Sequence, residues 1–451
     1  MKSDKTKWLV MAGVSIGTFM AVVDGTIVNI ALPTIERDFQ APFSTVQWVV
    51  LAYMLTLVTL LLTIGRLGDM FGKKRLYIAG YAIFTLGSFL CGISPTIGLL
   101  IAARVIQALG SVMLMALGVA IITEAFPASE RGKALGISGL IVSIGGISGP
   151  SLGGFLLSIS SWHLIFFVNL PIGLIGILLG LRYIPAHQPP GGQRFDLPGA
   201  FTLFASLFSL LIGLTYAQNK GFLQPATLAL FASFLVFLVI FLFIERRSPH
   251  PMIDLSMFQN KLFSVNLVTG FITFISSAGL VLLMPFYLQN VLKFSPGLSG
   301  LLLTTVPLSM GIVAPISGSL SDRFGSRPLT VAGLAVLVLA YLWATGLSET
   351  TSVLGYILHF IPIGVGMGLF QSPNNSAIMG AAPRERLGIA SGLLSITRTL
   401  GQTSGIAILG ALWASQVSRL SGLPAGEATN APGGFQLTAL HFTLYIVIVM
   451  I

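Results

Sequence analysis

The sequence predicts an all-helical membrane protein, on the evidence of its composition, its hydropathy and the spacing of its apolar runs. Hydrophobic residues make up 54% of the 451 positions and charged residues only 8%. Soluble globular domains carry roughly 25% charged residues, and the mean hydropathy here is +0.92. So few charges cannot cover the surface of a soluble fold of this size. The lipid bilayer is therefore the expected solvent.

Apolar runs long enough to cross a hydrocarbon core of ~30 Å recur along the whole chain, and we count fourteen of them. They lie near 9–32, 45–64, 76–95, 97–123, 134–157, 163–181, 198–216, 226–244, 262–288, 298–318, 329–347, 353–373, 389–413 and 437–451. The last run is short for a span, so we expect it to be tilted partly out of the membrane or truncated.

The lysines and arginines between these runs predict the orientation. Of the 24 Lys and Arg residues, four lie in one set of alternate loops, namely Arg37, Lys220, Lys293 and Arg419, and eighteen lie in the other set. Short cytoplasmic loops carry the excess of basic residues, so both termini are predicted to be cytoplasmic. The net charge of +10 is thus an orientation signal, and no nucleic-acid partner is expected.

Two motifs recur at nearly the same offset, which indicates an internal repeat. Gly65–Arg75 recurs at Gly318–Pro328, and the glycines at 132, 136, 145 and 149 recur at 388, 392, 401 and 405. The repeat period exceeds the length of six spans by enough residues for two more helices. The predicted domains are a six-helix bundle at 1–184, two inserted helices with their loops at 185–250, and a second six-helix bundle at 251–451. Parallel repeats of this kind are a known transporter architecture.

Three stretches resemble one known family. Gly65–Arg75 and its copy resemble the cytoplasmic signature loop of the major facilitator superfamily. Asp24–Pro33 resembles the opening pattern of the fourteen-span drug:proton antiporters, and Gly145-x3-Gly149-Pro150-x2-Gly153-Gly154 is similar to the antiporter signature of exporters. Ala108 and Ser138 stand where the family usually has glycine, and both keep a small side chain.

The resemblance implies the major facilitator fold, with two parallel-related six-helix bundles and two inserted central helices. It also implies a proton-coupled antiporter of the quaternary-ammonium or multidrug type, which exports lipophilic or cationic compounds by alternating access and confers antibiotic resistance. Its setting would be the bacterial plasma (inner) membrane, its form a monomer, and its energy source the proton gradient without a cofactor. The alternatives are a metabolite uptake or facilitated-diffusion transporter on the same fold, or a transporter-like sensor or scaffold.

The residues themselves provide no sign of an enzyme or a metalloprotein. The single cysteine, Cys91, rules out a disulfide framework, and the five histidines have no metal-ligand spacing. The sequence has no phosphate-binding loop of the Gly-Lys-Ser/Thr kind, so ATP is not the expected energy source.

The charges within the predicted spans are the candidates for proton coupling. Asp24 and Arg104 lie about 12 and about 10 Å below the outer ends of their spans, at 1.5 Å per residue. Each deep charge costs about 2.5–3.5 kcal/mol, so we expect the two to pair or to share one wet cavity. Asp24 is the predicted protonatable residue and a possible counter-charge for a cationic substrate, Arg104 its modulator, and Glu124 a third candidate. A purely structural buried pair is the alternative.

Further candidates belong to the substrate cavity and to contacts that change during transport. The predicted cavity residues are Asn29, Trp48, Tyr53, Gln107, Met113, Phe286, Tyr287, Gln289, Gln371, Asn374 and Arg398. The predicted cytoplasmic latch comprises Gly65, Asp69, Gly72, Lys74, Arg75, Arg131, Asp322 and Gly325. Its glycines allow a tight reversal, and Lys74 and Arg75 can pair with acids such as Glu124 or Glu130. The small residues Gly145, Gly149, Pro150, Gly153 and Gly154 predict a close, bendable helix contact.

Overall fold

The structure is a computed structural model that describes residues 4–127, 130–185, 196–247, 255–382 and 387–451. The first part of the chain forms α1 (Asp4–Phe39), α2 (Phe43–Val46), α3 (Trp48–Phe71), α4 (Lys73–Gly92), α5 (Ile97–Ala125), α6 (Arg131–Ile159), α7 (Leu164–Phe167) and α8 (Asn169–Tyr183). Two helices follow, α9 (Leu197–Lys220) and α10 (Pro225–Arg247). The last part forms η1 (Leu255–Gln259), α11 (Lys261–Phe286), η2 (Tyr287–Val291), α12 (Pro296–Leu303), α13 (Thr305–Phe324), α14 (Ser326–Ala344), α15 (Val353–Ala381), α16 (Leu387–Ser421), η4 (Ala425–Asn430) and α17 (Gly433–Met450).

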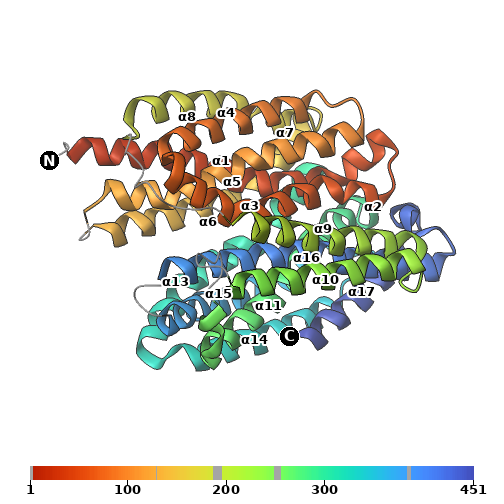
Figure 1. The fold of residues 1–451 in the computed structure, drawn as a ribbon. Helices are drawn as coiled ribbons and strands as arrows, with labels where there is room; N and C mark the ends of the chain where they lie inside the picture. Colours follow the sequence, from red (N-terminus) through yellow and green to blue (C-terminus); the bar gives the residue numbers. More distant parts are fainter. Residues whose placement is uncertain (1–3, 128–129, 186–195, 248–254, 383–386) are drawn as a thin grey trace.

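The helices form two groups that lie side by side. Figure 1 shows α1–α8 on one side of the molecule and α11–α17 on the other, and we call these groups the N-terminal half and the C-terminal half. The inserted helix α9 packs against α10, and it also contacts α3 of the first half and α16 of the second. The inserted pair thus lies along the boundary between the halves.

Thirteen helical segments within the described ranges are long and apolar enough to cross a membrane. The predicted all-helical membrane fold is therefore confirmed. The span predicted near 389–413 lies within the 35-residue helix α16, which is not among the thirteen. The last span is longer than the sequence indicates, because α17 begins at Gly433 and runs for 18 residues, about 27 Å at the helical rise.

The two halves repeat one helix contact, which glycines make possible. In the N-terminal half, a Cβ atom on Gly149 would lie 1.9 Å from Thr26 Oγ1, so α6 packs very closely against α1. In the C-terminal half, a Cβ atom on Gly405 would lie 2.3 Å from the Ile275 carbonyl oxygen, so α16 packs in the same way against α11. Glycine and other small residues allow helices to approach closely in lipid.

One step of this contact exchanges small and large residues between the halves. Gly153 of α6 accommodates Ile27 of α1, where an added Cβ would lie 2.8 Å from the isoleucine side chain. At the repeat-related position α16 has Leu409, and this leucine packs against Gly279 of α11, where an added Cβ would lie 2.2 Å away. The corresponding space between the two helices is therefore filled by Ile27 of α1 in the N-terminal half and by Leu409 of α16 in the C-terminal half.

The predicted latch loop is mostly helical, which corrects the sequence-based expectation. Helix α3 continues to Phe71, and the reversal into α4 is made by Gly72 alone, with φ of 96°. The repeat does the same at Gly325, with φ of 85°, between α13 and α14. Only glycine adopts such angles readily. Gly68 instead serves packing, since an added Cβ would lie 2.2 Å from Leu117 of α5.

Contacts between the halves cluster at one end of the molecule. We call this the outer end, because the loops there carry few basic residues, and we call the opposite end the basic end. Gln289 Nε2 donates to the Ile30 carbonyl oxygen at 2.9 Å, and the Thr429 hydroxyl donates to the Glu36 carboxylate. The Phe43 ring lies 5.1 Å from the rings of both Phe286 and Trp413.

These contacts close the molecule at its outer end. A cavity of about 890 Å³ lies there, and its lining includes Glu36, Gln289 and Thr429. Just inside the closure, α6 meets α12 of the C-terminal half through two glycines. A Cβ atom on Gly154 would lie 2.6 Å from the Pro296 carbonyl oxygen and 2.9 Å from the Gly300 Cα.

Gly154→Ala is expected to weaken closure of the outer end, because the new methyl group would meet backbone atoms of the other half. Overpacking costs typically about 1–3 kcal/mol, which corresponds to a shift of the closed–open equilibrium by about 5-fold to about 150-fold. Distances between spin labels on the outer ends of α1 and α11, measured by pulsed electron resonance, would report the shift. Gly146→Ala is the matched control on the same helix, because no atom lies within 4 Å of the added Cβ. Identical distance distributions in the two variants would contradict the role of the Gly154–Gly300 contact.

Candidate functional site

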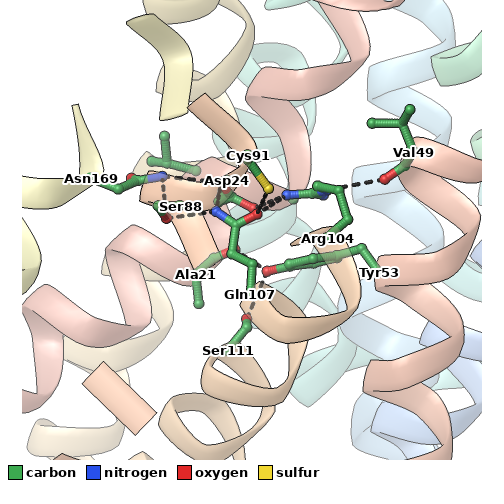
Figure 2. A network of polar contacts seen from close by, with 12 residues as sticks. Ala21, Asp24, Val49, Tyr53, Ser88, Cys91, Arg104, Gln107, Ser111 and Asn169 are labelled. Carbon is green, nitrogen blue, oxygen red and sulfur yellow. Dashed lines mark hydrogen bonds and ion pairs between the residues drawn. The ribbon is translucent and has the colours of Figure 1, made fainter. Parts of the chain in front are cut away.

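The N-terminal half contains a buried network of polar side chains around Asp24 of α1. Arg104 of α5 lies beside it, with its guanidinium Nη1 2.5 Å from Asp24 Oδ2. Gln107, one turn further along α5, donates through Nε2 to Asp24 Oδ1 at 2.7 Å. Asn169, the first residue of α8, donates to the same oxygen at 3.1 Å. Figure 2 shows these side chains converging on the carboxylate.

Further contacts fix the orientation of the arginine. Arg104 Nε donates to the Val49 carbonyl oxygen of α3 at 3.0 Å, and Nη1 also lies 2.5 Å from Gln107 Oε1. The guanidinium carbon lies 4.0 Å from the centre of the Tyr53 ring. The Tyr53 hydroxyl in turn lies 2.7 Å from Ser111 Oγ. Ser88 of α4 accepts from Gln107 Nε2 at 2.8 Å.

The network is closed to solvent in this state. Asp24 has an exposed fraction of 0% and Arg104 of 1%. Both carboxylate oxygens accept hydrogen bonds, so the burial of the two charges is compensated by pairing, as an ion pair in a membrane requires. A carboxylate in this position has no face turned toward a bound compound. The possible role of Asp24 as a direct counter-charge for a cationic substrate does not fit this state.

Among its described residues, the C-terminal half has no corresponding pair. Ser276 occupies the repeat-related position of Asp24, and its hydroxyl donates to the Ile272 carbonyl oxygen of its own helix at 2.9 Å. Near the position related to Arg104, Tyr356 and Phe360 stack with ring centres 4.2 Å apart. The two halves therefore share a helix arrangement but differ in the charges that it encloses.

The third candidate for proton coupling lies far from this network. Glu124 pairs with Lys73 at the basic end, about 30 Å from Arg104 along α5 at 1.5 Å per residue. The expected pairing of Lys74 and Arg75 with Glu124 or Glu130 is wrong. Lys74 instead donates to the Leu181 carbonyl oxygen at 2.8 Å, and Glu130 pairs with Lys7 at 2.6 Å.

The predicted cavity residues fall into three groups. Tyr53 and Gln107 belong to the Asp24 network. Five further residues are buried in helix contacts: Asn29, Phe286, Tyr287, Gln289 and Asn374. Tyr287 donates to the Ser348 carbonyl oxygen at 2.7 Å, and Trp48 donates to Thr215 of the inserted helix α9 at 3.1 Å.

The third group keeps some exposure and comprises Trp48, Met113, Gln371 and Arg398. Of the predicted latch, Asp322 is exposed at the basic end. The side chains of Asp69 and Arg131 lie outside the described part of the structure.

Sequence reasoning missed four members of the network, Ser88, Cys91, Ser111 and Asn169. Asn169 is the one that a sequence signal could have identified, since it is the only amide in the apolar run at 163–181. The two serines resemble many other small residues within the spans, so only the packing of the helices distinguishes them. No group of three or more His, Cys, Asp or Glu side chains that could hold a metal ion occurs in the ranges searched.

Comparison with known proteins identifies the family of this chain. The profile of the Major Facilitator Superfamily matches residues 14–406. The riboflavin transporter RibZ of Clostridioides difficile (strain 630) is 38% identical over 418 residues, covering 92% of this chain and 90% of that protein. The multidrug resistance protein Stp of Mycobacterium tuberculosis (strain CDC 1551 / Oshkosh) is 34% identical over 416 residues, covering 92% of this chain and 77% of that protein.

A solved structure shows the same fold. The crystal structure of a bacterial homolog of the human lysosomal transporter Spinster, in an inward-facing and unoccupied conformation, superposes with a TM-score of 0.68 over 99% of this chain and 95% of the other. At 17% identity this likeness concerns the fold alone. The membrane helices, the internal repeat and the family profile lead to one conclusion: the chain is a membrane transport protein and belongs to the Major Facilitator Superfamily.

Proposed function

We propose that this transporter is a proton-coupled exporter that works by alternating access, with Asp24 as its proton-binding residue. The observation that carries the proposal is the buried ion pair between Asp24 and Arg104. A carboxyl group deep in a membrane is costly and in transporters commonly belongs to a proton relay. The superfamily relatives named as multidrug resistance and export proteins, at 31–34% identity, support export of drug-like compounds.

The contacts of the pair suggest how a proton can be coupled to movement. When Asp24 is ionised, it holds α1, α5 and α8 together through Arg104, Gln107 and Asn169. Proton binding removes the charge that attracts Arg104, so these contacts weaken. Helix α1 also packs closely against α6 through glycines, and this contact would let α1 shift relative to α6. Protonation would therefore change the packing that sets which end of the transporter is open.

The remaining features fit the same proposal. The predicted latch, which includes Gly72, Asp322 and Gly325, would close the basic end when the outer end opens. Helix α16 would complete a set of fourteen spans, with α9 and α10 inserted between the six-helix bundles at 185–250. Both termini would be cytoplasmic in a bacterial plasma membrane, because eighteen of the 24 basic residues lie in the loops of one side. The polar contacts of the Asp24 network are satisfied within one chain, so a monomer is the proposed form.

Transport in proteoliposomes with an imposed pH gradient tests the proposal. Amphipathic dyes of either charge are loaded on one side, and a pH-sensitive fluorophore is trapped in the vesicles. An antiporter should move a dye against its gradient while protons move the opposite way, and no such movement should occur at equal pH. Dye movement that is indifferent to the pH gradient would reject proton coupling.

A second function is favoured by one comparison. One relative with 38% identity over most of both chains is named a riboflavin transporter rather than a drug exporter. Uptake or facilitated diffusion of a metabolite on the same fold is therefore the alternative. Gradient-independent movement in the same assay would support it.

A further inference from the structure

Arg398 of α16 is a charged side chain that the proton-coupling network does not use. It lies about nine residues into the predicted span at 389–413, or about 13 Å at the helical rise. The residue is exposed. Its guanidinium carbon lies 5.9 Å from the centre of the Phe274 ring of α11, near the outer limit for an attraction between a cation and a ring.

No carboxylate pairs with Arg398 in the part of the chain that the structure describes. The ion pairs there join Lys7 to Glu130, Lys73 to Glu124, and Arg104 to Asp24. Asp24 is the only deep carboxylate among the described residues, and its charge is already matched by Arg104. Arg398 is therefore a positive charge within a predicted span that no carboxylate of the described residues compensates.

Arg398 lies on an exposed, polar face of α16. Ser391, Ser395 and Arg398 are all exposed and share one face of α16, because they are spaced by four and three residues. Leu393 and Ile396 are buried on the opposite face. An exposed guanidinium surrounded by lipid is strongly disfavoured, whereas one beside a water-filled path between helices is common in transporters. Helix α16 also contacts α3 of the other half, so it borders the boundary along which such a path would run.

We propose that Arg398 binds the acidic group of the transported compound, so that the preferred substrates are amphipathic organic anions rather than cations. This inference rests on the proposed export function, whose substrate it specifies. A guanidinium group donates two parallel hydrogen bonds to a carboxylate or another planar oxyanion. The polar stripe of Ser391 and Ser395 supplies further hydroxyl groups on the same face.

Charge balance explains the selectivity. An anion that reaches Arg398 neutralises the uncompensated charge that this residue places in the membrane interior. A cation would add a second positive charge nearby in a medium of low dielectric constant, where repulsion is stronger than in water. Asp24 does not neutralise a bound cation, because both of its carboxylate oxygens already accept hydrogen bonds from donors of the N-terminal half.

Equilibrium binding of two dyes with the same ring system tests the proposal. Fluorescein is anionic and rhodamine 123 is cationic, and both are bound to the purified full chain in lipid nanodiscs at equal pH. Fluorescein is expected to bind more tightly. Arg398→Gln should weaken fluorescein binding at least tenfold without weakening rhodamine binding, and Arg398→Lys should retain part of the affinity because it keeps the charge.

Matched controls separate this role from general damage. Arg419→Gln removes an exposed arginine from the outer end of the same helix, and it should leave both affinities unchanged. Preference of the unmodified protein for rhodamine, failure of fluorescein to bind, or equal fluorescein affinity in folded Arg398→Gln would each overturn the proposal. The binding assay uses no pH gradient, so its result is independent of proton coupling. Selective anion binding without gradient-driven transport would reject the exporter function and leave this inference standing.

Discussion

Asp24→Asn is expected to reduce gradient-driven transport in proteoliposomes to the level of protein-free vesicles. An asparagine at this position cannot take up and release a proton, so the pH gradient can no longer drive transport through this residue. The amide also replaces one acceptor oxygen of the network with a donor, which leaves Arg104 without its anionic partner. The measurement is dye movement and internal pH change under an imposed pH gradient, with wild-type protein alongside.

Two further measurements distinguish loss of coupling from loss of structure. Dye counterflow at equal pH requires no net proton movement, so it is expected to persist in Asp24→Asn. The double variant Asp24→Asn with Arg104→Gln removes both charges and should be more stable than the single variant, yet remain uncoupled. Full gradient-driven transport by folded Asp24→Asn would show that the pair is purely structural.

Arg104→Gln is expected to destabilise the folded protein more than Gly154→Ala or Arg398→Gln. It leaves the Asp24 carboxylate buried and without its cationic partner, and breaking a buried pair in this way costs about 3–5 kcal/mol. The variant also loses the bond from Arg104 Nε to the Val49 carbonyl oxygen, which ties α5 to α3. The free energy of unfolding, measured by detergent denaturation, would report the change.

The matching control is an arginine outside the membrane interior. Arg37→Gln alters an exposed side chain at the outer end of α1, so its effect should remain within about 0.5 kcal/mol. The double variant Asp24→Asn with Arg104→Gln should lose much less free energy of unfolding than the sum of the losses in the two single variants. Each single change leaves one charge unpaired, whereas the double change leaves none. Strict additivity, or an effect of Arg104→Gln no larger than that of Arg37→Gln, would contradict the energetic role of the pair.

The sequence predicted those parts of the site that depend on depth in the membrane. Charged residues in apolar runs are rare, so Asp24, Arg104 and Arg398 could be identified from the chain alone. Depth along a helix follows from residue count, which places Asp24 and Arg104 at similar levels. Ser88 and Ser111 could not be found in this way, because a small hydroxyl side chain in a membrane helix has many possible partners.

The sequence-based expectations for the latch loop and for the partner of Lys74 were wrong, because both depend on contacts with neighbouring helices. Gly65, Gly68 and Gly72 predicted a loop, but α3 continues through the first two, and Gly68 lets α5 approach closely through Leu117. Only Gly72 has the positive φ that reverses the chain. Lys74 bonds to a carbonyl oxygen of α8 rather than to an acid, because α8 ends beside it. Propensity along one segment contains no information about these contacts.

The sequence by itself determined the solvent, the helical class, the repeat and the candidate charges of this protein. Hydropathy and the positions of basic residues are properties of each segment alone, so they can be read in order along the chain. The tertiary structure alone decided that α1, α3, α4, α5 and α8 contribute to one buried network around Asp24, and that contacts between the halves close the outer end. Those outcomes depend on side chains separated by tens to hundreds of residues, whose meeting is fixed by how glycines and bulky residues fill the space between helices.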